Sequence, residues 1–443
     1  MTASLIEKSP DRIAWQCSEA FGRERVLLAS GEHFRIADET QRVVAFPRSI
    51  AELSEMMRFA ASEKLIVIPA GAGTWLEMGN QPVRAHLVIS TAQMNRVLEY
   101  EPADLTATLE AGCTLTGFNA RAAEHRQQIP LDPFGDQRST IGAIVATASH
   151  GPLRCSSGTP RDQVVGMRVV HADGRITKAG GKVVKNVAGY DLCKLYTGSY
   201  GTLGIISELN LKMRARPESE RTMFFFNQDA MKLCALAAQI MDSDVQPGAM
   251  ELFSPQFDRL RLEYGEGRFT LALRFLNAPE TIDAQVAEAL RHGDGFRYSI
   301  LSGADAMTFW RDYHEDESAM TWDIIFRVSV LPSDIAMMIA EIGATIPQAS
   351  LRVHAANGII RVHAKAHTLD DFKKRERPIR FAELRQHAQA RGGQMIIQRL
   401  PAELKYKLDA WGDSGQTAPL MLALKKQFDP HSQLNPGRFV AGI

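Results

Sequence analysis

Three glycine-rich segments lie between residues 69 and 213, and they constrain the fold more than any other feature of this sequence. The segment 180–213 alone holds six glycines and runs into an alternating, strand-like pattern. The other two segments are 69–79 and 132–151. Glycine lets the backbone approach a neighbouring group closely, because it has no side chain. Such a chain is expected to press its backbone against a bound group or against another chain segment.

The first segment, PAGAGTWLEMG at 69–79, follows a short apolar strand pattern at Leu65–Ala70. Backbone N–H groups in such a loop form a concave site for an anion, and Thr74 adds a hydroxyl donor. The spacing matches neither the GxGxxG dinucleotide fingerprint nor the P-loop. Two interpretations therefore stay open for this segment, a phosphate or pyrophosphate site and a plain glycine turn.

The second segment, DPFGDQRSTIGAIVATASHG at 132–151, predicts a helix of small residues over 139–151. Thr140 and Gly142 open this helix, and N–H groups at a helix N-terminus suit an anion. Small side chains also permit a close helix–sheet contact without any ligand. That second interpretation is adequate for one loop alone, and it weakens when three glycine-rich segments share one region.

The chain has 443 residues, which exceeds one ordinary hydrophobic core and favours two domains. Lys+Arg and Asp+Glu are both 51, so the formal charge of zero gives no support to a nucleic-acid partner. No signal peptide and no apolar run long enough to span a bilayer are expected. The five cysteines are scattered, which fits a reduced cytosolic compartment and argues against an iron–sulfur cluster or structural zinc in this chain.

Short strands and helices mix from Val43 onward, which predicts an α+β fold rather than a doubly wound dinucleotide fold. Ser49 and Glu52 have capping-box spacing before a helix, and Asp173–Gly174 predicts a hairpin turn. The charged segment 214–223 is expected to separate two domains. The expected division is 1–42 as an arm or helices, 43–217 as the first domain, and 218–443 as an antiparallel sheet with helices on one side, near 279–291, 305–313, 333–342, 379–390 and 417–427.

Four segments together resemble the FAD-binding domain of the vanillyl-alcohol oxidase/p-cresol methylhydroxylase (PCMH) type: PAGAGT, TIGAIVATASHG, SSGTPRDQVVGMRVVHADG and residues 180–213. KNVAGYDL, GSYGTLG and FDPHSQLNPGRF (Phe428–Phe439) narrow the resemblance to the FAD-binding E subunit of bacterial glycolate oxidase. The resemblance covers most of Val43–Pro217 and the C-terminal tail. It implies a PCMH-type domain of two α+β subdomains, then a C-terminal FAD-linked oxidase-like α+β domain whose tail, 428–439, returns to the flavin.

The same resemblance implies FAD as the cofactor and assigns residues to it. The pyrophosphate is implied to lie against the loop Ala70, Gly71, Ala72, Gly73 and Thr74. Further implied contacts are Thr140, Ile141, Gly142, Ser149, His150 and Gly151 along the cofactor, Ile205 at the adenine, Lys185 and Asn186 at the flavin or its phosphate, and Asn435 at the isoalloxazine edge. Lys185 could instead be a solvated surface residue, and Asn435 part of a simple turn. No pattern ties His150 or Cys155 to covalent attachment, so non-covalent FAD is expected.

Candidate catalytic residues lie in the second half of the chain. A 2-hydroxy acid dehydrogenase needs a cation for the carboxylate and a base for the hydroxyl proton. Arg327 in FRVSVLPSD is a candidate for the carboxylate, with a structural ion pair as the alternative. Related catalytic chains carry a DGN flanked by two histidines and a later Glu–His pair. RVHAANGIIRVHAKAH keeps His354 and His363 but lacks the aspartate, so no metal site is expected, and the two histidines are either site residues or solvent-facing strand residues.

Two functions of different class follow from the resemblance. The first is an FAD-dependent oxidoreductase subunit of a glycolate oxidase complex, which oxidises glycolate or a similar 2-hydroxy acid. The second is an FAD-holding electron-relay or scaffold subunit whose paralogous partner oxidises the substrate. A free-standing alcohol or D-lactate oxidase is a third possibility. The implied partners are a homologous flavoprotein and an iron–sulfur subunit, in the cytoplasm or peripheral to the inner membrane through the complex.

Overall fold

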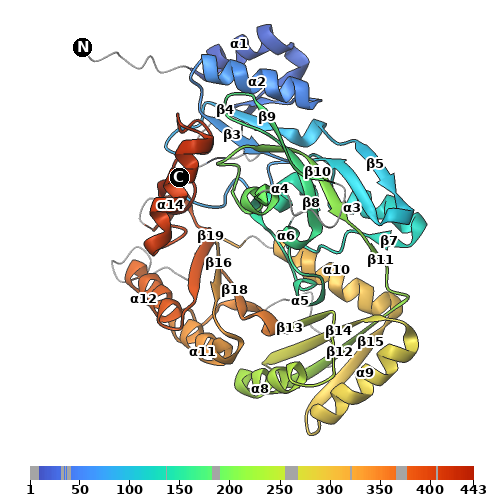
Figure 1. The fold of residues 1–443 in the computed structure, drawn as a ribbon. Coiled ribbons are helices and arrows are strands. Elements are labelled where there is room, and N and C mark those ends of the chain that lie inside the picture. Colours follow the sequence, from blue (N-terminus) through green and yellow to red (C-terminus); the bar gives the residue numbers. More distant parts are fainter. Residues whose placement is uncertain are drawn as a thin grey trace.

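The computed structural model describes residues 9–30, 34, 36, 41–135, 137–181, 190–254, 268–319, 322–365, 377–405 and 408–443. Within these residues the strands form four sheets, with four, five, two and eight strands. The four- and five-stranded sheets belong to the first half of the chain, and the eight-stranded sheet belongs to the second half (Figure 1). The mixture of helix and sheet confirms the predicted α+β class.

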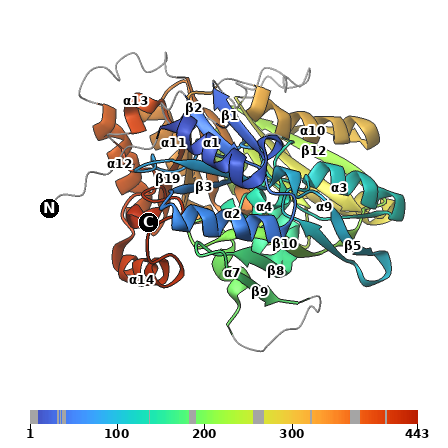
Figure 2. The ribbon, with the colours of Figure 1, turned by 90° about the horizontal axis from the view of Figure 1, so that it is seen from above.

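The four-stranded sheet has the order β1-β2-β4-β3, with β1 at Val26–Ser30, β2 at Gln41–Ala45, β4 at Leu87–Ser90 and β3 at Val67–Ala70. The pairs β2–β4 and β3–β4 are parallel, and β1–β2 is antiparallel. Helices α1 (Pro10–Phe21) and α2 (Ile50–Ser62) bury their apolar faces in the same core (Figure 2). Ser49 caps α2 by accepting a hydrogen bond from the Glu52 N–H at 3.2 Å, as the capping-box spacing predicts.

The five-stranded sheet is antiparallel, in the order β5-β6-β10-β8-β9. Its strands are β5 (Val97–Glu101), β6 (Thr106–Glu110), β10 (Ile205–Lys212), β8 (Val164–Val170) and β9 (Ile176–Gly180). The predicted hairpin joins β8 to β9, and its turn includes Gly174 with a φ of +81°. Helices α3 (Leu115–Ala122) and α4 (Ile141–Thr147) share the apolar core of this sheet.

Helix α4 is shorter than the predicted 139–151. It ends because Ala148 adopts a left-handed backbone with a φ of +51°. The residues after it, including Ser149 and Gly151, therefore leave the helix as a loop. A two-stranded ribbon of β7 (Gln127–Gln128) and β11 (Arg214–Ala215) then leads into the second half of the chain. The domain boundaries given above stay a prediction.

The eight-stranded sheet is antiparallel throughout, with the order β15-β12-β14-β13-β17-β18-β16-β19. Its strands are β12 (Ser219–Asn227), β13 (Ala249–Phe253), β14 (Phe269–Asn277), β15 (Arg297–Ser302), β16 (Ile324–Ser329), β17 (Ser350–His354), β18 (Ile359–Ala364) and β19 (Gln394–Arg399).

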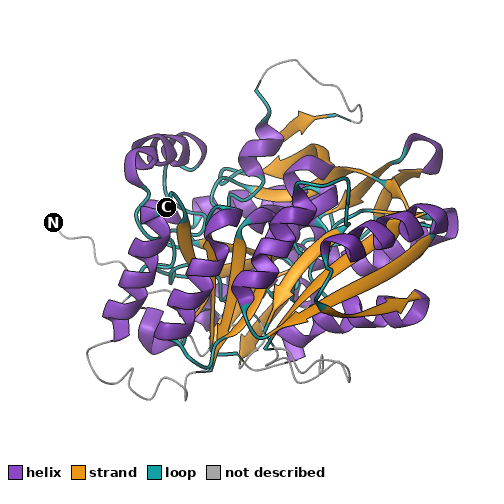
Figure 3. Ribbon diagram, turned by 90° about the horizontal axis from the view of Figure 1, so that it is seen from below, coloured by secondary structure: helices purple, strands orange, loops and turns teal. Residues whose placement is uncertain are grey.

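The two faces of this sheet differ in chemistry, because side chains alternate along each strand. One face is apolar and packs against α8 (Ala230–Met241), α9 (Pro279–His292), α11 (Ile335–Thr345) and α12 (Arg377–Ala390) (Figure 3). The other face meets α10 (Gly303–Ala319) and Phe134 from the first half of the chain, and it carries the buried charged residues of this sheet, Glu251, Arg352 and Arg361. The polar face is therefore the part of the sheet that adjoins the glycine-rich loops.

The C-terminal helix α14 (Ala418–Phe428) brings the tail back to the first sheet. Leu434 forms a parallel bridge with Val67 of β3, and the Asn435 N–H donates to the Val67 carbonyl at 3.0 Å. The tail thus lies directly beside the loop that follows β3.

Candidate functional site

A cavity of about 750 Å³ lies between the glycine loop after β3, helix α4 and the C-terminal tail. It is also lined by Tyr200, Gly201 and the start of β10. Of the residues predicted to bind the cofactor, seven line it: Ala70, Gly71, Gly73, Thr74, Gly142, Ile205 and Asn435.

The other predicted cofactor residues do not line this cavity. Thr140 caps α4 by accepting a hydrogen bond from the Ala143 N–H at 3.3 Å, and Ile141 is a buried residue of the same helix. Lys185 and Asn186 lie outside the described residues. The remaining ones, Ala72, Ser149, His150 and Gly151, lie in the adjoining loops and are not among the residues that line the cavity.

Glycine is required at two positions of the cavity loop. A Cβ atom on Gly71 would lie 2.1 Å from Thr140 Oγ1, so the loop could not pack against α4 with any side chain there. Gly73 has a φ of +83°, which side chains rarely allow, and a Cβ there would lie 3.0 Å from the Phe34 ring. The loop is therefore a backbone cradle that opens onto the cavity beside it.

The tail is fastened by a buried ion pair that the sequence did not reveal. Lys425 Nζ contacts Asp429 Oδ2 at 2.7 Å and donates to the carbonyls of Thr202 and Leu434 at 2.8 and 2.7 Å. Asp429 also accepts hydrogen bonds from the N–H groups of Gln433 and Leu434. Burial lowers the pKa of Lys425, and the Asp429 charge opposes that shift.

Tyr200 and Arg438 are among the cavity residues that the sequence analysis missed. Asn435 Nδ2 donates to the Tyr200 carbonyl at 2.6 Å, and Arg438 donates to the Met78 carbonyl at 2.8 Å. Burial lowers the pKa of Arg438 to about 10, and desolvation raises the pKa of the half-buried Tyr200. Both lie in motifs that carried the resemblance, GSYGTLG and NPGRF, so their positions could have been proposed from those motifs.

Three arginines form a row across neighbouring strands of the polar sheet face. Arg352 of β17 pairs with Arg361 of β18, and Arg361 pairs with Arg327 of β16. Because neighbouring strands lie about 4.8 Å apart, the three side chains project side by side from one face. We call Arg327, Arg352 and Arg361 the arginine row.

The arginine row is linked to the first cavity by a second, neighbouring cavity. Arg361 lines a second cavity of about 840 Å³, which shares Thr74, Trp75 and Met78 with the first. Burial lowers the pKa of Arg327; Tyr200 opposes that shift, and Arg361 and Arg154 add to it. Within the described part of the chain, Arg327 forms no ion pair with a carboxylate, so the structural ion-pair alternative finds no partner there.

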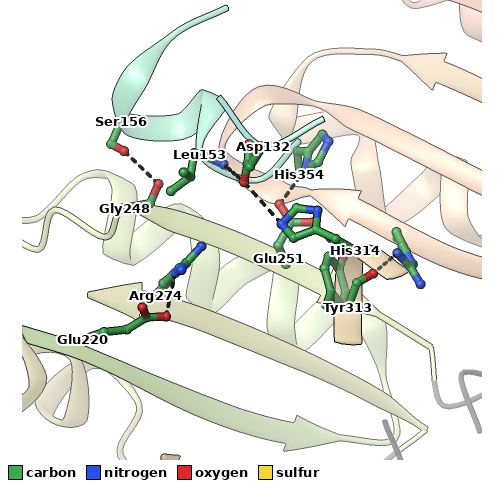
Figure 4. Close-up of polar contacts among 11 residues, drawn as sticks. Asp132, Leu153, Ser156, Glu220, Gly248, Glu251, Arg274, Tyr313, His314 and His354 are labelled. Atoms are coloured by element: carbon green, nitrogen blue, oxygen red, sulfur yellow. Dashed lines mark hydrogen bonds and ion pairs between the residues drawn. The ribbon is translucent and has the colours of Figure 1, made fainter. Parts of the chain in front are cut away.

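His354 sits at the end of β17 in a buried polar cluster (Figure 4). Its Nδ1 contacts Glu251 Oε1 of β13 at 2.5 Å, and Tyr313 of α10 donates its hydroxyl to Glu251 Oε2 at 2.8 Å. His354 is 2% exposed and Glu251 is 0% exposed. The interpretation of His354 as a solvent-facing strand residue is therefore wrong.

His363 is also buried, at 0% exposure, so the solvent-facing interpretation is wrong for it as well. It does not meet His354, because in the β17–β18 hairpin His363 pairs with Ser350 and His354 pairs with Ile359. The two histidines thus lie four residues apart along the strands, roughly 13 Å at about 3.3 Å per residue. The His363 ring packs beside Trp322, with ring centroids 5.7 Å apart.

His150 lies beside His354, with ring centroids 5.8 Å apart. Arg154, in the short helix α5 (Arg154–Ser157), donates from Nη1 to His150 Nε2 at 2.7 Å. Burial lowers the pKa of His150, and the nearby His354, Arg154, Arg327 and Arg361 lower it further. His150 is therefore neutral, and Arg154 leaves its proton on Nδ1.

Comparison with known proteins agrees with this geometry. Residues 41–180 match the family described as FAD binding domain. The glycolate oxidase subunit GlcD of Bacillus subtilis is 29% identical over 421 residues, which is 90% of this chain and 88% of that protein. GlcE, a glycolate oxidase subunit of Escherichia coli, is 31% identical over 269 residues, which is 58% of this chain and 74% of that protein. The probable mitochondrial D-lactate dehydrogenase of Danio rerio is 26% identical, with 89% and 84% covered.

The chain belongs to the FAD-dependent oxidoreductase family that includes these glycolate oxidase subunits. Its cofactor is FAD, and it is an oxidoreductase. Solved structures share the fold at low identity. An alkyldihydroxyacetonephosphate synthase has a TM-score of 0.73 at 18% identity, covering 97% of this chain and 85% of that one. A p-cresol methylhydroxylase has a TM-score of 0.72 at 13% identity, covering 97% and 96%.

Among the residues that the structure describes, no group of three or more His, Cys, Asp and Glu side chains has the arrangement of a metal site. In the same part of the chain, every helix is too short or too polar to cross a bilayer.

Proposed function

We propose that this protein oxidises a small 2-hydroxy acid to the 2-oxo acid, with Arg327 binding the substrate carboxylate. The observation that carries the proposal is the half-buried Arg327 side chain, whose Nε is buried without a hydrogen-bond partner and which has no carboxylate partner among the described residues. A guanidinium fork binds a carboxylate through two parallel hydrogen bonds. FAD supplies the chemistry, because its flavin accepts a hydride from the substrate carbon.

We further propose that the predicted loops hold FAD in the 750 Å³ cavity. The cradle at Ala70–Thr74 would take the pyrophosphate, and Ile205 and Asn435 would contact other parts of the cofactor. This assignment rests on the residues that line the cavity and on the positions where a Cβ atom does not fit. The cavity then brings the flavin to the side of the sheet that carries the arginine row.

Glycolate is our first candidate substrate, and D-lactate is the second. Two relatives are named glycolate oxidase subunits and a third is named a probable D-lactate dehydrogenase, which supports a 2-hydroxy acid in both cases. We also propose membership of a complex with a homologous flavoprotein and an iron–sulfur subunit, in the cytoplasm or peripheral to the membrane. The relatives named as subunits support this, and the identity to GlcE supports an E-type subunit. A relay or scaffold role is the second candidate, because RVHAANGIIRVHAKAH lacks the aspartate of the DGN motif that related catalytic chains carry.

The test begins with the purified chain under anaerobic conditions. Addition of glycolate or D-lactate should bleach the flavin absorbance if this chain performs the oxidation. Arg327→Met should lower kcat/KM by about ten- to a hundredfold, because hydrogen bonds to charged groups contribute about 1.5–3 kcal/mol. Arg274→Lys, on the same sheet but bonded to Glu220, is the control and should retain wild-type kcat/KM.

The outcomes separate the candidates. Flavin that stays oxidised in the isolated chain, but is reduced after co-expression with a homologous flavoprotein and an iron–sulfur protein, supports the relay or scaffold role. If Arg327→Met keeps the wild-type kcat/KM, a residue other than Arg327 binds the substrate carboxylate. A flavin that no 2-hydroxy acid reduces in any preparation would refute the proposed function.

A further inference from the structure

We propose that His354 accepts the substrate hydroxyl proton at Nε2, and that Glu251 is the positioning residue that enables it to do so. This inference rests on the proposed function, because it names the base for the same reaction. The substrate C2–H bond would break, with the hydrogen and both bonding electrons leaving as a hydride, which bound FAD would accept. The hydroxyl O–H bond breaks with its proton going to His354, and the C2–O bond becomes a carbonyl.

The hydrogen bonds of His354 leave one nitrogen available. Nδ1 faces the Glu251 carboxylate at 2.5 Å, and a carboxylate only accepts, so the proton of the neutral ring lies on Nδ1. Nε2 is buried and has no hydrogen-bond partner among the described residues. An unpartnered buried acceptor is costly, so its presence points to a ligand group that donates to it.

The second oxygen of Glu251 is also held. Tyr313 donates its hydroxyl to Oε2 at 2.8 Å, and burial, followed by the Glu251 charge, raises the pKa of Tyr313 well above its usual range. Tyr313 therefore stays protonated and remains a donor. Both carboxylate oxygens are fixed, which holds the imidazole of His354 in one orientation (Figure 4).

The charges around the two neighbouring histidines assign them different roles. His150 faces a guanidinium, which opposes any further positive charge on its ring. His354 faces a carboxylate, which stabilises the imidazolium formed when Nε2 takes a proton. Neighbouring titratable groups with opposite environments commonly divide donor and acceptor roles in this way. His150 keeps a proton on Nδ1, where it can donate a hydrogen bond but cannot accept the hydroxyl proton.

Glu251 matters here because the surroundings are otherwise cationic. An imidazolium on His354 would form close to the arginine row, and these positive charges disfavour it. Charged and titratable groups from every neighbouring element surround the His354–Glu251 pair. They are Asp132, His150, Arg154, Cys155, Tyr313, His314, Arg327, Arg352 and Arg361. Within the described residues, Glu251 is the carboxylate that directly contacts His354.

The variant Glu251→Gln tests the positioning role, since glutamine can still accept from Nδ1 but carries no charge. The rate of flavin reduction should fall about a hundredfold, the size of a general-base contribution. Substrate Kd and FAD content should change little, so the loss should appear in the reduction rate and not in binding. Glu220→Gln is the matched control, because Glu220 is a half-buried acid of the same sheet that bonds Arg274 at 2.9 Å. It should keep the wild-type rate.

The variant His354→Asn tests the base itself. Asparagine can replace the Nδ1 donor toward Glu251 but has no equivalent of Nε2, so the fold should survive while flavin reduction slows by about a hundredfold or more. Adding Glu251→Gln to His354→Asn should cause no further loss, because the acid acts through the imidazole. A wild-type rate of flavin reduction in His354→Asn would overturn the assignment. This test does not depend on Glu251→Gln, so it applies even if that variant does not accumulate as folded protein. A second full loss in the double variant would also overturn it.

A measurement without substrate separates this inference from the proposed function. In isotope-labelled protein, the NMR signal of the His354 Nδ1–H proton should lie far downfield, because this proton is hydrogen-bonded to a carboxylate. It should move upfield in Glu251→Gln and should not move in Glu220→Gln. An unchanged signal in Glu251→Gln would refute the pairing even if the enzyme is active. A shifted signal in a protein that no 2-hydroxy acid reduces would instead leave the pair standing and refute the proposed function.

Discussion

Replacing Lys425 with methionine should destabilise the protein and weaken FAD binding together, because this side chain fastens the tail beside the cofactor cavity. Its ammonium group contacts Asp429 and two backbone carbonyls, all within 2.8 Å. Lys425 is 5% exposed and Asp429 is 1% exposed. Methionine fills a similar volume but leaves the Asp429 charge and both carbonyls without their cation.

The size of the effect follows from that geometry. Removing one partner of a buried ion pair costs about 3–5 kcal/mol, because the remaining charge stays buried. Two N–H groups still donate to Asp429, which places the expected loss toward the lower end, about 3 kcal/mol. Since native proteins are stable by about 5–15 kcal/mol, this loss is a large fraction of the total. The tail residues Asn435 and Arg438 line the cavity, so FAD should dissociate more readily as well.

Urea denaturation followed by circular dichroism and flavin fluorescence measures both effects. Lys426→Met is the control, because Lys426 is the exposed neighbour on the same helix and should lose almost nothing. The double variant Lys425→Met with Asp429→Leu should be more stable than Lys425→Met alone, since it removes the uncompensated charge. If Lys425→Met has the same stability and FAD affinity as Lys426→Met, Lys425 does not fasten the tail beside the cavity.

Two further predictions concern the cradle and the thiols. Gly71→Ala should reduce the FAD bound to the purified protein, because the new Cβ would lie 2.1 Å from Thr140 Oγ1. Gly181→Ala is the control and should bind FAD normally, because a Cβ there meets no atom within 4 Å. Equal FAD content in the two variants would contradict the cradle. Burial raises the pKa of all five free cysteines from 9.0 to about 11, so the folded protein disfavours the thiolates. The resulting stabilisation is present below pH 9 and lost as the pH rises through about 11; stability that stays constant over this window would contradict the burial of the thiols.

Local sequence signals predicted many elements of the fold. The Ser49 cap, the Gly174 turn and the alternation in β10 depend on residues close together in the chain, and the structure contains all three features. Helix α4 was predicted too long, because the pattern of small residues continues past the point where Ala148 turns left-handed. Strand β1 was not predicted, since its role comes from pairing with β2 across an intervening segment.

The glycine loops beside the cavity could be predicted because glycine positions report a backbone requirement directly. The polar face of the eight-stranded sheet could not, because its burial depends on long-range packing. Alternation along β17 and β18 places Arg352, His354, Arg361 and His363 on one face of the sheet. No local sequence pattern indicates that other residues cover this face. Phe134, more than two hundred residues away in the chain, stacks on His354 and covers it. The partner Glu251 lies in a strand that is otherwise apolar, AMELF, and that single acid is the one local signal available.

The arginine row explains why the eight-stranded sheet has two such different faces. Burying neighbouring guanidinium groups is unfavourable, as the lowered pKa of Arg327 beside Arg361 indicates. A protein tolerates such strain where a ligand relieves it, and an anionic substrate would do so at Arg327. The apolar face of the sheet, packed against four helices, provides the rigid support that keeps these charges in place. The same alternation of side chains therefore places an apolar core on one side of the sheet and the arginine row on the other, where we propose that the substrate carboxylate binds.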